Sequence, residues 1–464
     1  MFPLILLNPW TPVYDNDLDP WIPELWAQES LMVLEANMVM ANLVHRDFSP
    51  IIAQFGDIVH TRQPGRFTMK RKTDSDNVTK QDATATNVPV HLNQHLHTSF
   101  IIKDGEESKG FVSLRNEYLE PALWSIAQGI DQILLGEVYN FIGNSAGQIG
   151  VAADKAALID LRVAQNELKC PLQGRNLVVT PNTEGDLLNV ADFTTADKIG
   201  DEGTVMREGS LGRRFGYNIF MCQNTPSVPA TATDLVTGAV DLAAGYAAGT
   251  TTIAVDGFSA AIAAGSWFYV AGDLTPQTVI STVGGATPTS ITFSPGLKNA
   301  VADNAVVTVV DPIAVDNTAG YAQYYAKDIV TDGETNDPVV GQMLSSGVSG
   351  TNQYRYGLID NTAANNMYLN RALDAALVND QALFPGPMGQ YNFAFHRNAL
   401  ALVSRPLALP AAGTGALAAV VNFNSLSVRV VITYDGDAQG HLVTVDMLCG
   451  VKTLDTDLGA VLYA

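Results

Sequence analysis

Residues 55–104 constrain the fold of this 464-residue chain most strongly. Two stretches in which polar and apolar residues alternate, 56–72 and 87–103, flank a polar segment at 73–86. The alternation predicts a hairpin of two long strands with a polar tip. Arms of about fifteen residues would project roughly 50 Å at about 3.3 Å per residue, and an isolated two-stranded ribbon is only marginally stable in water. We therefore expect this ribbon to lie on another surface, such as a neighbouring subunit.

The N-terminal residues 1–23 have no regular period, and they combine several prolines with the aromatic residues Trp10 and Trp21. Such a segment cannot form its own core, so we expect an extended arm that buries its tryptophans elsewhere. The surface that receives them is either another subunit or the arm's own subunit. A helix is predicted next, from Glu24 to Val44, because apolar residues recur there at three- to four-residue steps.

Two further helices are predicted beyond the ribbon. In Leu114–Ile142 the apolar residues keep close to a 3.6-residue period, and Pro121 fits an early helical position or a kink. A second helix covers Ala152–Leu168 and is ended by Pro171. A buried strand is predicted directly after it, at 176–181, because this short segment is apolar and ends in a proline.

The composition changes between Thr225 and about Val310, where the chain has no Arg and a single Lys, Lys298. Short strand candidates separated by turn residues predict a small β-barrel or sandwich set inside an α+β protein. These candidates are 251–255, 266–272, 277–283, 289–294 and 304–310. Beyond them, a helix is predicted at Asn365–Val378, and β structure returns at 391–407 and in a hairpin at 427–451.

The chain carries a formal net charge of −21, with 47% hydrophobic and 16% charged residues. The apolar content suffices for a folded core, while so acidic a subunit repels phosphates, which disfavours general nucleic-acid binding. Cys170, Cys222 and Cys449 form no CxxC pair, which indicates a reducing compartment. The N-terminus lacks the basic segment of a signal peptide, and no stretch approaches the ~18 apolar residues of a membrane span. We expect a soluble chain made in the cytosol.

Three motif matches suggest chemistry that their contexts do not support. Gly143–Gly147 fits the GxSxG pattern of hydrolases, yet the serine follows a long helix instead of a strand, so a helix-ending loop is preferred. Residues 435–446 resemble a calcium loop, but both flanks are predicted strands, so a hairpin turn is preferred. His91, His95 and His97 would share one strand face and could hold zinc, but no fourth ligand is near them in sequence. We therefore predict no enzyme, no metal and no cofactor.

A cluster of basic residues stands on the outgoing arm of the predicted ribbon, in an otherwise acidic chain. The cluster could contact DNA, dock on an acidic neighbour or form a solvated face. Docking is favoured because opposite charges steer subunits together and set their register. The predicted inter-subunit contacts are Arg62, Arg66, Lys70, Arg71, Lys72, Trp10 and Trp21.

The order of these parts resembles that of the coat proteins of tailed bacteriophages with the Hong Kong ninety-seven fold. It is closest to the coat protein of the short-tailed Salmonella phages. Short segments are also similar to that family: FAFHRNA at 393–399, VSRPL at 403–407, VDMLCGVK at 445–452 and AGSWFYVAG at 264–272. The resemblance implies an α+β capsid fold with an N-terminal arm, an extended loop, a spine helix, axial and peripheral domains, and an inserted all-β barrel.

The resemblance also assigns a part of that fold to nearly every stretch of the chain. Only 313–390 stays open, either as part of the insertion or as a connection between the axial and peripheral domains. The implied parts are the arm and helix at 1–50, the extended loop at 51–108, the spine helix of the peripheral domain at 109–149, the axial domain at 150–224, the inserted barrel at 225–312 and the returning core strands at 391–464.

A major capsid protein of this family self-assembles as pentamers and hexamers into an icosahedral shell around double-stranded DNA. The resemblance therefore implies a scaffolding protein and a portal as partners, and packaged DNA held at the inner face without sequence specificity. It implies a location in the virion, with assembly in the host cytoplasm and no membrane partner. The alternative is a β-rich surface or binding protein that uses the 225–310 module.

Overall fold

The computed structural model describes most of the chain from residue 39 onward, within a compact unit formed by residues 36–464. The helix predicted at Glu24–Val44 is described only at its end, where α1 covers Met40–Leu43. Trp10, Trp21 and Arg66 lie outside the described residues. The described residues are 39–46, 58–63, 67–74, 77–78, 80–81, 86–107, 114–194, 209, 211–229, 235–332, 338–347, 353–363, 365–405, 407–411, 417–423 and 426–464.

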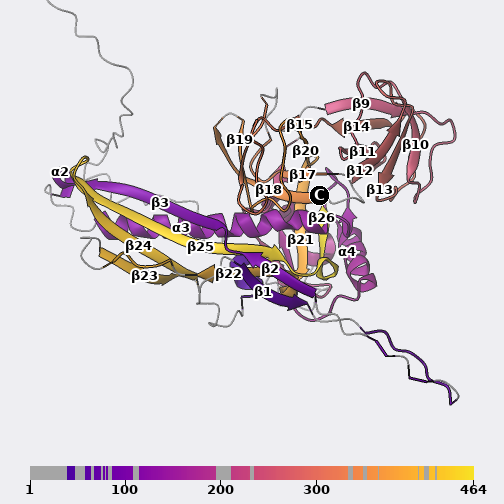
Figure 1. The fold of residues 1–464 in the computed structure, drawn as a ribbon. Helices are drawn as coiled ribbons and strands as arrows, with labels where there is room; N and C mark the ends of the chain where they lie inside the picture. The colour runs from indigo at the N-terminus through magenta and orange to yellow at the C-terminus, as the bar shows by residue number, and fades with distance from the viewer. Residues whose placement is uncertain are drawn as a thin grey trace, which may run out of the picture. The chain divides into compact units, whose positions relative to one another are not determined.

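A long helix, α3 (Leu114–Leu135), continues into the 3-10 helix η2 (Gly136–Phe141), which confirms the helix predicted at 114–142. Its buried residues Ile126, Ile130 and Ile133 recur at three- and four-residue steps, as the core-facing stripe of a helix requires. The helix lies along a five-stranded sheet (Figure 1) and contacts two of its strands, β3 and β25. The strands of this sheet are β3 (Gln94–Lys103), β22 (Leu400–Arg405), β23 (Leu417–Phe423), β24 (Leu426–Asp435) and β25 (Gly440–Thr453).

The predicted long ribbon is wrong in its pairing. Strand β1 (Ile58–Gln63) pairs antiparallel with β2 (Thr86–His91) over six residues. The second half of the predicted returning arm is β3, which pairs instead with residues 440–449 of β25. Polar and apolar alternation is the same for either partner, so it could not show that the C-terminal hairpin provides the longer pairing. A short helix, α2 (Asp104–Glu107), follows β3.

A seven-stranded sheet is formed by strands from the middle and the end of the chain. These strands are β4 (Ser145–Gly147), β5 (Arg175–Val179), β6 (Arg213–Arg214), β7 (Tyr217–Met221), β8 (Ser227–Val228), β21 (Gly389–His396) and β26 (Gly459–Tyr463). Every residue of β5 is buried, which confirms the buried strand predicted near 176–181. The 3-10 helix η3 (Arg397–Ala399) directly follows β21, and the 3-10 helix η4 (Thr456–Leu458) directly precedes β26.

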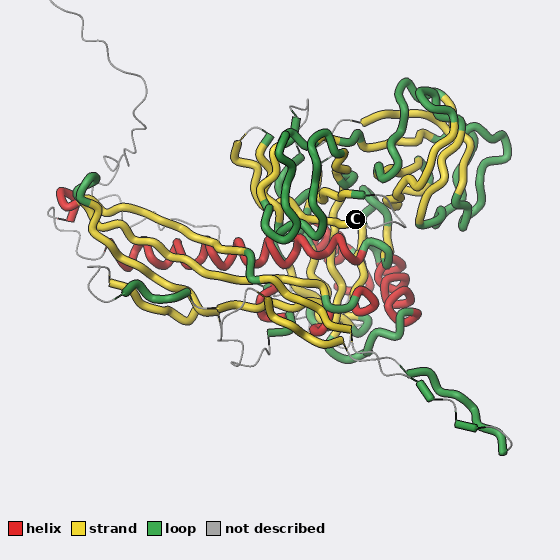
Figure 2. The backbone as a smooth tube through the Cα atoms, in the orientation of Figure 1, coloured by secondary structure: helices red, strands yellow, loops and turns green. Residues whose placement is uncertain are grey.

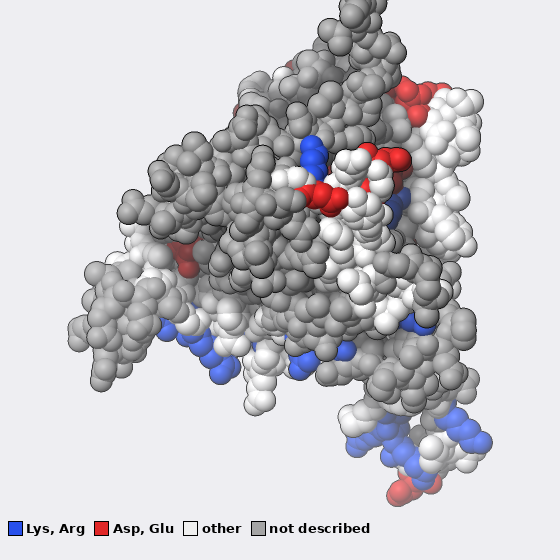
Figure 3. Space-filling view, turned by 90° about the vertical axis from the view of Figure 1, so that its left-hand side faces the viewer, with Lys and Arg blue, Asp and Glu red and all other residues white. Residues whose placement is uncertain are grey.

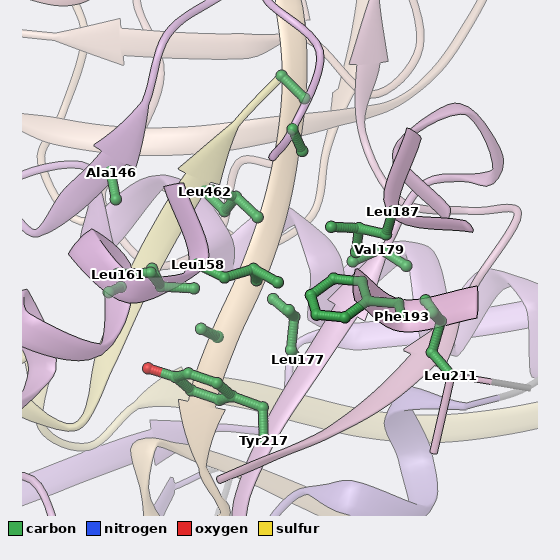
Figure 4. Close-up of a cluster of buried hydrophobic side chains, with 14 residues drawn as sticks. Ala146, Leu158, Leu161, Leu177, Val179, Leu187, Phe193, Leu211, Tyr217 and Leu462 are labelled. Carbon is green, nitrogen blue, oxygen red and sulfur yellow. The ribbon is translucent and has the colours of Figure 1, made fainter. Parts of the chain in front are cut away.

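Helix α4 (Lys155–Glu167) confirms the helix predicted at 152–168 and covers this sheet. Its buried side chains Leu158 and Leu161 pack with Leu177 of β5 and Leu462 of β26 in one apolar cluster (Figure 4). Asp154 is the N-cap residue of this helix, and its side chain accepts a hydrogen bond from the backbone N–H of Ala157 at 2.8 Å. Helices α5 (Pro181–Asn189) and α6 (Ala191–Thr194) follow β5.

The predicted small β-barrel or sandwich is a closed barrel in the order β10-β13-β12-β11-β14-β9. Its strands are β9 (Leu235–Val240), β10 (Thr252–Asp256), β11 (Trp267–Val270), β12 (Asp273–Val283), β13 (Ser290–Ser294) and β14 (Val306–Val310), with turns and loops between them (Figure 2). Apolar side chains fill the interior, including Phe268 and Phe293, whose rings meet edge to face with centroids 5.1 Å apart. Closure leaves the barrel without free strand edges.

Residues 313–385 form a six-stranded sheet, and the helix predicted at Asn365–Val378 is wrong. Residues 366–369 are a strand in which Met367 and Leu369 are buried, while Asn366 and Tyr368 are half-buried. This two-residue period was outweighed in the sequence by the four-residue spacing of Tyr368, Ala372 and Ala376. The strands are β15 (Ile313–Ala314), β16 (Asp328–Val330), β17 (Met343–Ser346), β18 (Tyr354–Ala363), β19 (Asn366–Leu369) and β20 (Ala382–Pro385).

Candidate functional site

The described residues between β1 and β2 carry an exposed basic surface. We call residues 67–74, 77–78 and 80–81 the basic segment; they form no helix or strand. Phe67 is 67% exposed, Met69 96% and Val78 71%, so these large apolar side chains have no cover in their own described chain. Lys and Arg side chains gather at this end of the molecule (Figure 3, lower right). Exposed apolar and basic groups together are typical of a binding surface.

The basic segment contains three of the predicted contact residues, Lys70, Arg71 and Lys72, and each of them is exposed. Lys80 is exposed on the returning part of the same segment. None of these four residues forms an ion pair with another described residue. Of the other predicted residues, Arg62 lies on β1 opposite Asn87. The sequence therefore located a group of cations that its own described subunit leaves unpaired.

The root of this hairpin is held by the rest of the chain. Val59 of β1 and Val90 of β2 are buried in a cluster with Ala401 and Val403 of β22. Beyond the paired strands, the Thr68 N–H donates to Gln81 Oε1 at 3.0 Å, which connects the two sides of the basic segment. A buried root and an exposed end give the segment a fixed origin while its side chains stay accessible.

The three histidines do not form one site. His91 lies on β2, where its ring stacks on Tyr324 with centroids 4.6 Å apart. His95 and His97 lie on exposed positions of β3, and His95 Nε2 is 3.1 Å from Asp446 Oδ2. The strand break between β2 and β3 separates His91 from the other two, so the three histidines do not stand on one regular strand. Among the described residues, no group of three or more His, Cys, Asp or Glu side chains could hold a metal ion.

Asp446 is a buried carboxylate that lies between an arginine and a histidine. Its Oδ1 accepts from Arg429 Nε at 2.9 Å, and its Oδ2 contacts both Arg429 Nη2 and His95 Nε2. Burial alone would raise the pKa of Asp446, but Arg429 and His95 together hold the pKa below its usual range. The residue therefore joins β25 to β24 through an ion pair with Arg429 and to β3 through its contact with His95. In the turn between β24 and β25, the Asp435 side chain accepts a hydrogen bond from the N–H of Asp437 at 2.9 Å.

Ser145 of the GxSxG match opens the short strand β4 and follows a 3-10 helix and a turn. The predicted helix-ending loop is therefore partly a strand, which runs parallel to β26. Lys298 Nζ donates to Ser145 Oγ at 3.1 Å and also to the Ser145 carbonyl oxygen. The strand-to-helix turn of the hydrolase elbow is not formed at this serine.

Sequence reasoning missed a largely buried network of four charged side chains, which we call the charge network: Glu137, Arg371, Asp374 and Lys452. Arg371 Nε lies 2.8 Å from Glu137 Oε1, and its Nη1 pairs with Asp374. Lys452 Nζ lies 2.9 Å from Asp374 Oδ1, so the two positive and two negative charges balance. Glu137 is the one sequence feature that could have indicated this network, because it interrupts the apolar stripe of the long helix one turn after Ile133.

The charge network joins three elements that are far apart in sequence. Glu137 comes from η2, Lys452 from β25, and Arg371 and Asp374 from the loop after β19. Glu137 also accepts from Asn370 Nδ2 at 2.9 Å and from Thr453 Oγ1 at 2.7 Å. The backbones meet closely here, since a Cβ on Gly357 of β18 would lie 2.5 Å from Gly136 Cα. Burial would raise the pKa of Asp374, but Arg371 and Lys452 hold it below its usual range.

Asp131 of α3 holds the described end of the N-terminal region. Its Oδ2 accepts from the Val39 N–H at 2.8 Å and its Oδ1 from the Ala41 N–H at 3.1 Å. Burial raises the pKa of Asp131 to about 6, although these backbone hydrogen bonds act in the opposite direction. The carboxylate thus fixes the point at which the chain enters α1.

A groove runs beside α4, between this helix, β4 and residues 298–299 of the barrel, and encloses a cavity of about 590 Å³. Small residues line much of its floor, and Asp154, Asp160 and Glu167 contribute three exposed carboxylates. Tyr463 of β26 lines the same groove and is 1% exposed. We call this feature the α4 groove.

Among the described residues, no helix combines the length and apolar character needed to cross a membrane.

No protein-family model matches the sequence, and no curated protein matches it. Among solved structures, the chain is similar to one titled Mycobacterium phage Che8, with 15% identity, a TM-score of 0.46, and coverage of 95% of this chain and 97% of that chain. It is similar to the capsid structure of the cyanophage P-SCSP1u at 12% identity and a TM-score of 0.44, covering 96% of this chain and 94% of that chain. For the mature capsid of bacteriophage PhiM1 the identity is 11%, the TM-score 0.39 and the coverage 88% and 82%.

Proposed function

We propose that this chain is a shell-forming structural subunit, the major capsid protein of a tailed bacteriophage, whose function lies in its contacts with further copies of itself. One observation carries the proposal. The basic segment exposes Phe67, Met69 and Val78 next to cations that have no ion-pair partner among the described residues. Apolar groups exposed in this way cost free energy in a monomer, and burying them against a neighbour recovers about 25 cal/mol per Å².

The arrangement of the other parts supports the same proposal. In the capsid assignment implied by the sequence, α3 is the spine helix and the five-stranded sheet beside it belongs to the peripheral domain. The seven-stranded sheet with α4 is the core of the axial domain, and the closed barrel is the inserted domain. Residues 313–385 form a sheet of their own, which we assign to the connection between barrel and core.

The finer features of such a shell are part of the proposal. Pentamers and hexamers of the chain would form an icosahedral particle in the virion, assembled in the host cytoplasm on a scaffolding protein and a portal. The particle would enclose double-stranded DNA. Because the chain has a net charge of −21, its inner face would hold that DNA without sequence specificity and by few direct contacts.

The rival proposal is a binding protein that uses the barrel to hold a ligand. The packing of the barrel interior argues against it. Ligand-binding barrels enclose a cavity, whereas this interior is filled by apolar side chains such as Phe268, Phe293 and Ile253. A hydrolase function through Ser145 is also disfavoured, because the strand-to-helix turn of the hydrolase elbow is not formed at this serine. A shell subunit needs neither a ligand cavity nor a catalytic group.

Negative-stain microscopy and sedimentation velocity of the expressed protein, with and without a co-expressed scaffold, test the proposal. Wild-type protein is expected to form shells or capsomers. Reversing the charges of Arg62, Arg66 and Arg71 together should block or misdirect assembly while the circular dichroism spectrum stays unchanged. A wild-type protein that stays a compact monomer at high concentration under both conditions would refute the proposed function.

A further inference from the structure

Within the described residues, the chain passes directly between the five-stranded and the seven-stranded sheet three times, and each passage is a 3-10 helix. η2 leads from α3, which lies along the five-stranded sheet, to β4 of the seven-stranded sheet. η3 leads from β21 to β22, and η4 leads from β25 to β26. A 3-10 helix has poorer hydrogen-bond geometry than an α-helix and often marks a hinge. Any movement of one sheet relative to the other must therefore pass through these three short helices.

The three helices differ in how well they are packed. Five of the six residues of η2 are buried, whereas Ala399 is the one buried residue of η3, and η4 has none. The strand β26, which follows η4, is buried throughout. Regions with few buried apolar contacts open at the lowest free energy. We call η3 and η4 together the joint, because they should yield while η2 stays packed.

Few hydrogen bonds hold the joint closed. The Leu454 N–H, just before η4, donates to the carbonyl oxygen of Ala399 at the end of η3 at 2.8 Å. Each of the two helices also has a side-chain cap. Asp455 caps η4 by accepting from the Asp457 N–H at 3.0 Å, and His396 caps η3. The two caps are thus titratable side chains at the two points where the chain crosses between the sheets.

The cap of η3 requires an uncharged His396 ring. Its Nδ1 accepts a hydrogen bond from the Asn398 N–H at 3.3 Å. An imidazolium ring carries a proton on both nitrogens and has no acceptor left. Protonation of His396 therefore removes the cap and points two N–H groups at each other.

A buried arginine lies opposite the same ring. His396 of β21 pairs directly with Arg175 of β5, so the two side chains stand on one face of the sheet. Arg175 is 2% exposed, and its guanidinium donates to the carbonyl oxygens of Cys170 and Pro171 at 2.7 and 2.8 Å. These bonds keep the guanidinium from turning away. A second positive charge on His396 is repelled at this position.

The other titratable groups on the elements around His396 do not offset this repulsion. They are Arg397 of η3, Asp455 and Asp457 of η4, and the Cys170 thiol of the loop before β5. Burial, and after it the Arg175 guanidinium, lowers the pKa of His396 below its ordinary value of 6.5. The closed joint therefore binds this proton more weakly than an open joint, in which the ring is in water. The closed form has its full advantage above about pH 6.5 and loses it as the pH falls below that value.

We propose that η3 and η4 form an acid-sensitive hinge between the two sheets, which is closed while His396 is neutral and loosens when the ring takes up a proton. The five-stranded sheet can then turn relative to the seven-stranded sheet about the buried η2. The hinge belongs to the single subunit, so it does not depend on the proposed self-assembly.

Distance measurements between two spin labels test the hinge. One label is placed through Leu417→Cys on β23 and the other through Leu172→Cys between α4 and β5; both positions are exposed, and the native cysteines are buried. An excess of unlabelled protein ensures that distances within one subunit are recorded. Wild-type protein should give a narrow distance distribution at pH 8 and a broader or shifted one at pH 5. A control pair on one side of the joint, Val163→Cys with Leu172→Cys, should give the same distribution at both pH values.

Two substitutions separate His396 from other effects of acid. His396→Asn keeps an oxygen acceptor for the Asn398 N–H and takes up no proton, so the joint should stay closed at pH 5. His396→Lys is permanently charged and has no acceptor, so the joint should be open already at pH 8. Amide hydrogen exchange gives a second readout. Exchange at residues 398–400 and 454–458, relative to His396→Asn at the same pH, should rise by up to about tenfold for each pH unit below about 6.5.

Three results would overturn the hinge. They are unchanged wild-type distances between pH 8 and pH 5, the same change in His396→Asn as in wild type, and a change in the control pair as large as that across the joint. If His396→Lys does not fold by circular dichroism, the comparison of wild type with His396→Asn decides alone. A wild-type protein that never assembles would refute the proposed function and leave the hinge measurable, so the two proposals fail separately.

Discussion

The charge network and the basic segment collect charges in opposite ways. In the charge network, Glu137 and Arg371 are buried and Asp374 and Lys452 are half-buried, and each of the four is paired inside the subunit. In the basic segment, Lys70, Arg71 and Lys72 are exposed and unpaired by other described residues. The first arrangement joins parts of one chain, whereas the second leaves its charges available to another chain. The surroundings of a charge, more than its sign or number, therefore indicate whether it stabilises the subunit or is available for assembly.

The largest effect is expected inside the charge network. Glu137→Ala removes the carboxylate that is ion-paired with Arg371 and leaves the charge network with one excess positive charge in a buried site, which costs about 3–5 kcal/mol. Urea unfolding followed by circular dichroism should show the loss. Glu137→Gln keeps the shape and part of the hydrogen bonding, so it should cost less. An alanine variant as stable as wild type would show that the pairing contributes nothing.

The next effect depends on pH and concerns Asp131. Its folded-state pKa of about 6 lies above the ordinary 3.8, so the folded state binds this proton more tightly than the unfolded state. The resulting contribution, about 3 kcal/mol, is fully present below about pH 4 and is lost as the pH rises through about 6. The stability difference between wild type and Asp131→Asn should therefore shift in favour of wild type between pH 7 and pH 4. A difference that is constant over this range would contradict the raised pKa.

A smaller effect separates the two partners of Asp446. Arg429→Ala removes two of its contacts and leaves a buried carboxylate with only His95, which should cost about 2–3 kcal/mol. His95 is half exposed, and His95→Ala should cost about 1 kcal/mol or less. Thermal unfolding of the two variants at pH 7 gives the comparison, and the reverse order would show that His95 is the main partner.

The smallest effect on stability is expected in the basic segment. Lys70→Glu, Arg71→Glu and Lys72→Glu together should change the free energy of unfolding by no more than about 0.5 kcal/mol, because exposed side chains without partners contribute little. The same variant should lose assembly in sedimentation velocity, and the wild-type contact should weaken as salt is raised. A clear loss of subunit stability would mean that these charges have partners within their own chain.

Elements with a strong local period could be predicted from the sequence. The apolar stripe of α3, the spacing in α4 and the short apolar strands of the barrel each follow from residues that are neighbours in sequence. Partners could not be predicted in the same way. β3 has the alternation of a strand that pairs with the arm before it, but it pairs with residues 440–449, and alternation does not identify a partner. At β19, a period of two over four residues was too short to outweigh a competing period of four.

In the candidate site, too, the locally determined features could be predicted and the features that depend on distant segments could not. Lys70, Arg71 and Lys72 could be predicted as exposed, because three consecutive cations in a polar segment have no local reason to be buried. The α4 groove could not, since it is formed by α4, β4, β26 and a loop of the barrel. The charge network could not be predicted for a similar reason. Glu137 interrupts the apolar stripe of its helix, but Arg371 and Asp374 follow strand β19, where the sequence pattern predicts a helix.

The pairing of β3 with β25 also sets the order in which the chain can fold. Residues 94–103 meet partners that are made about 340 residues later, and at about 5–20 residues per second this strand waits roughly 17–70 s for them during synthesis. The barrel at 235–310 closes entirely with partners from its own segment, so it is expected to form while β3 is still unpaired. Limited proteolysis of ribosome-bound chains that end before residue 440 should therefore cut within 94–103 and leave 235–310 intact.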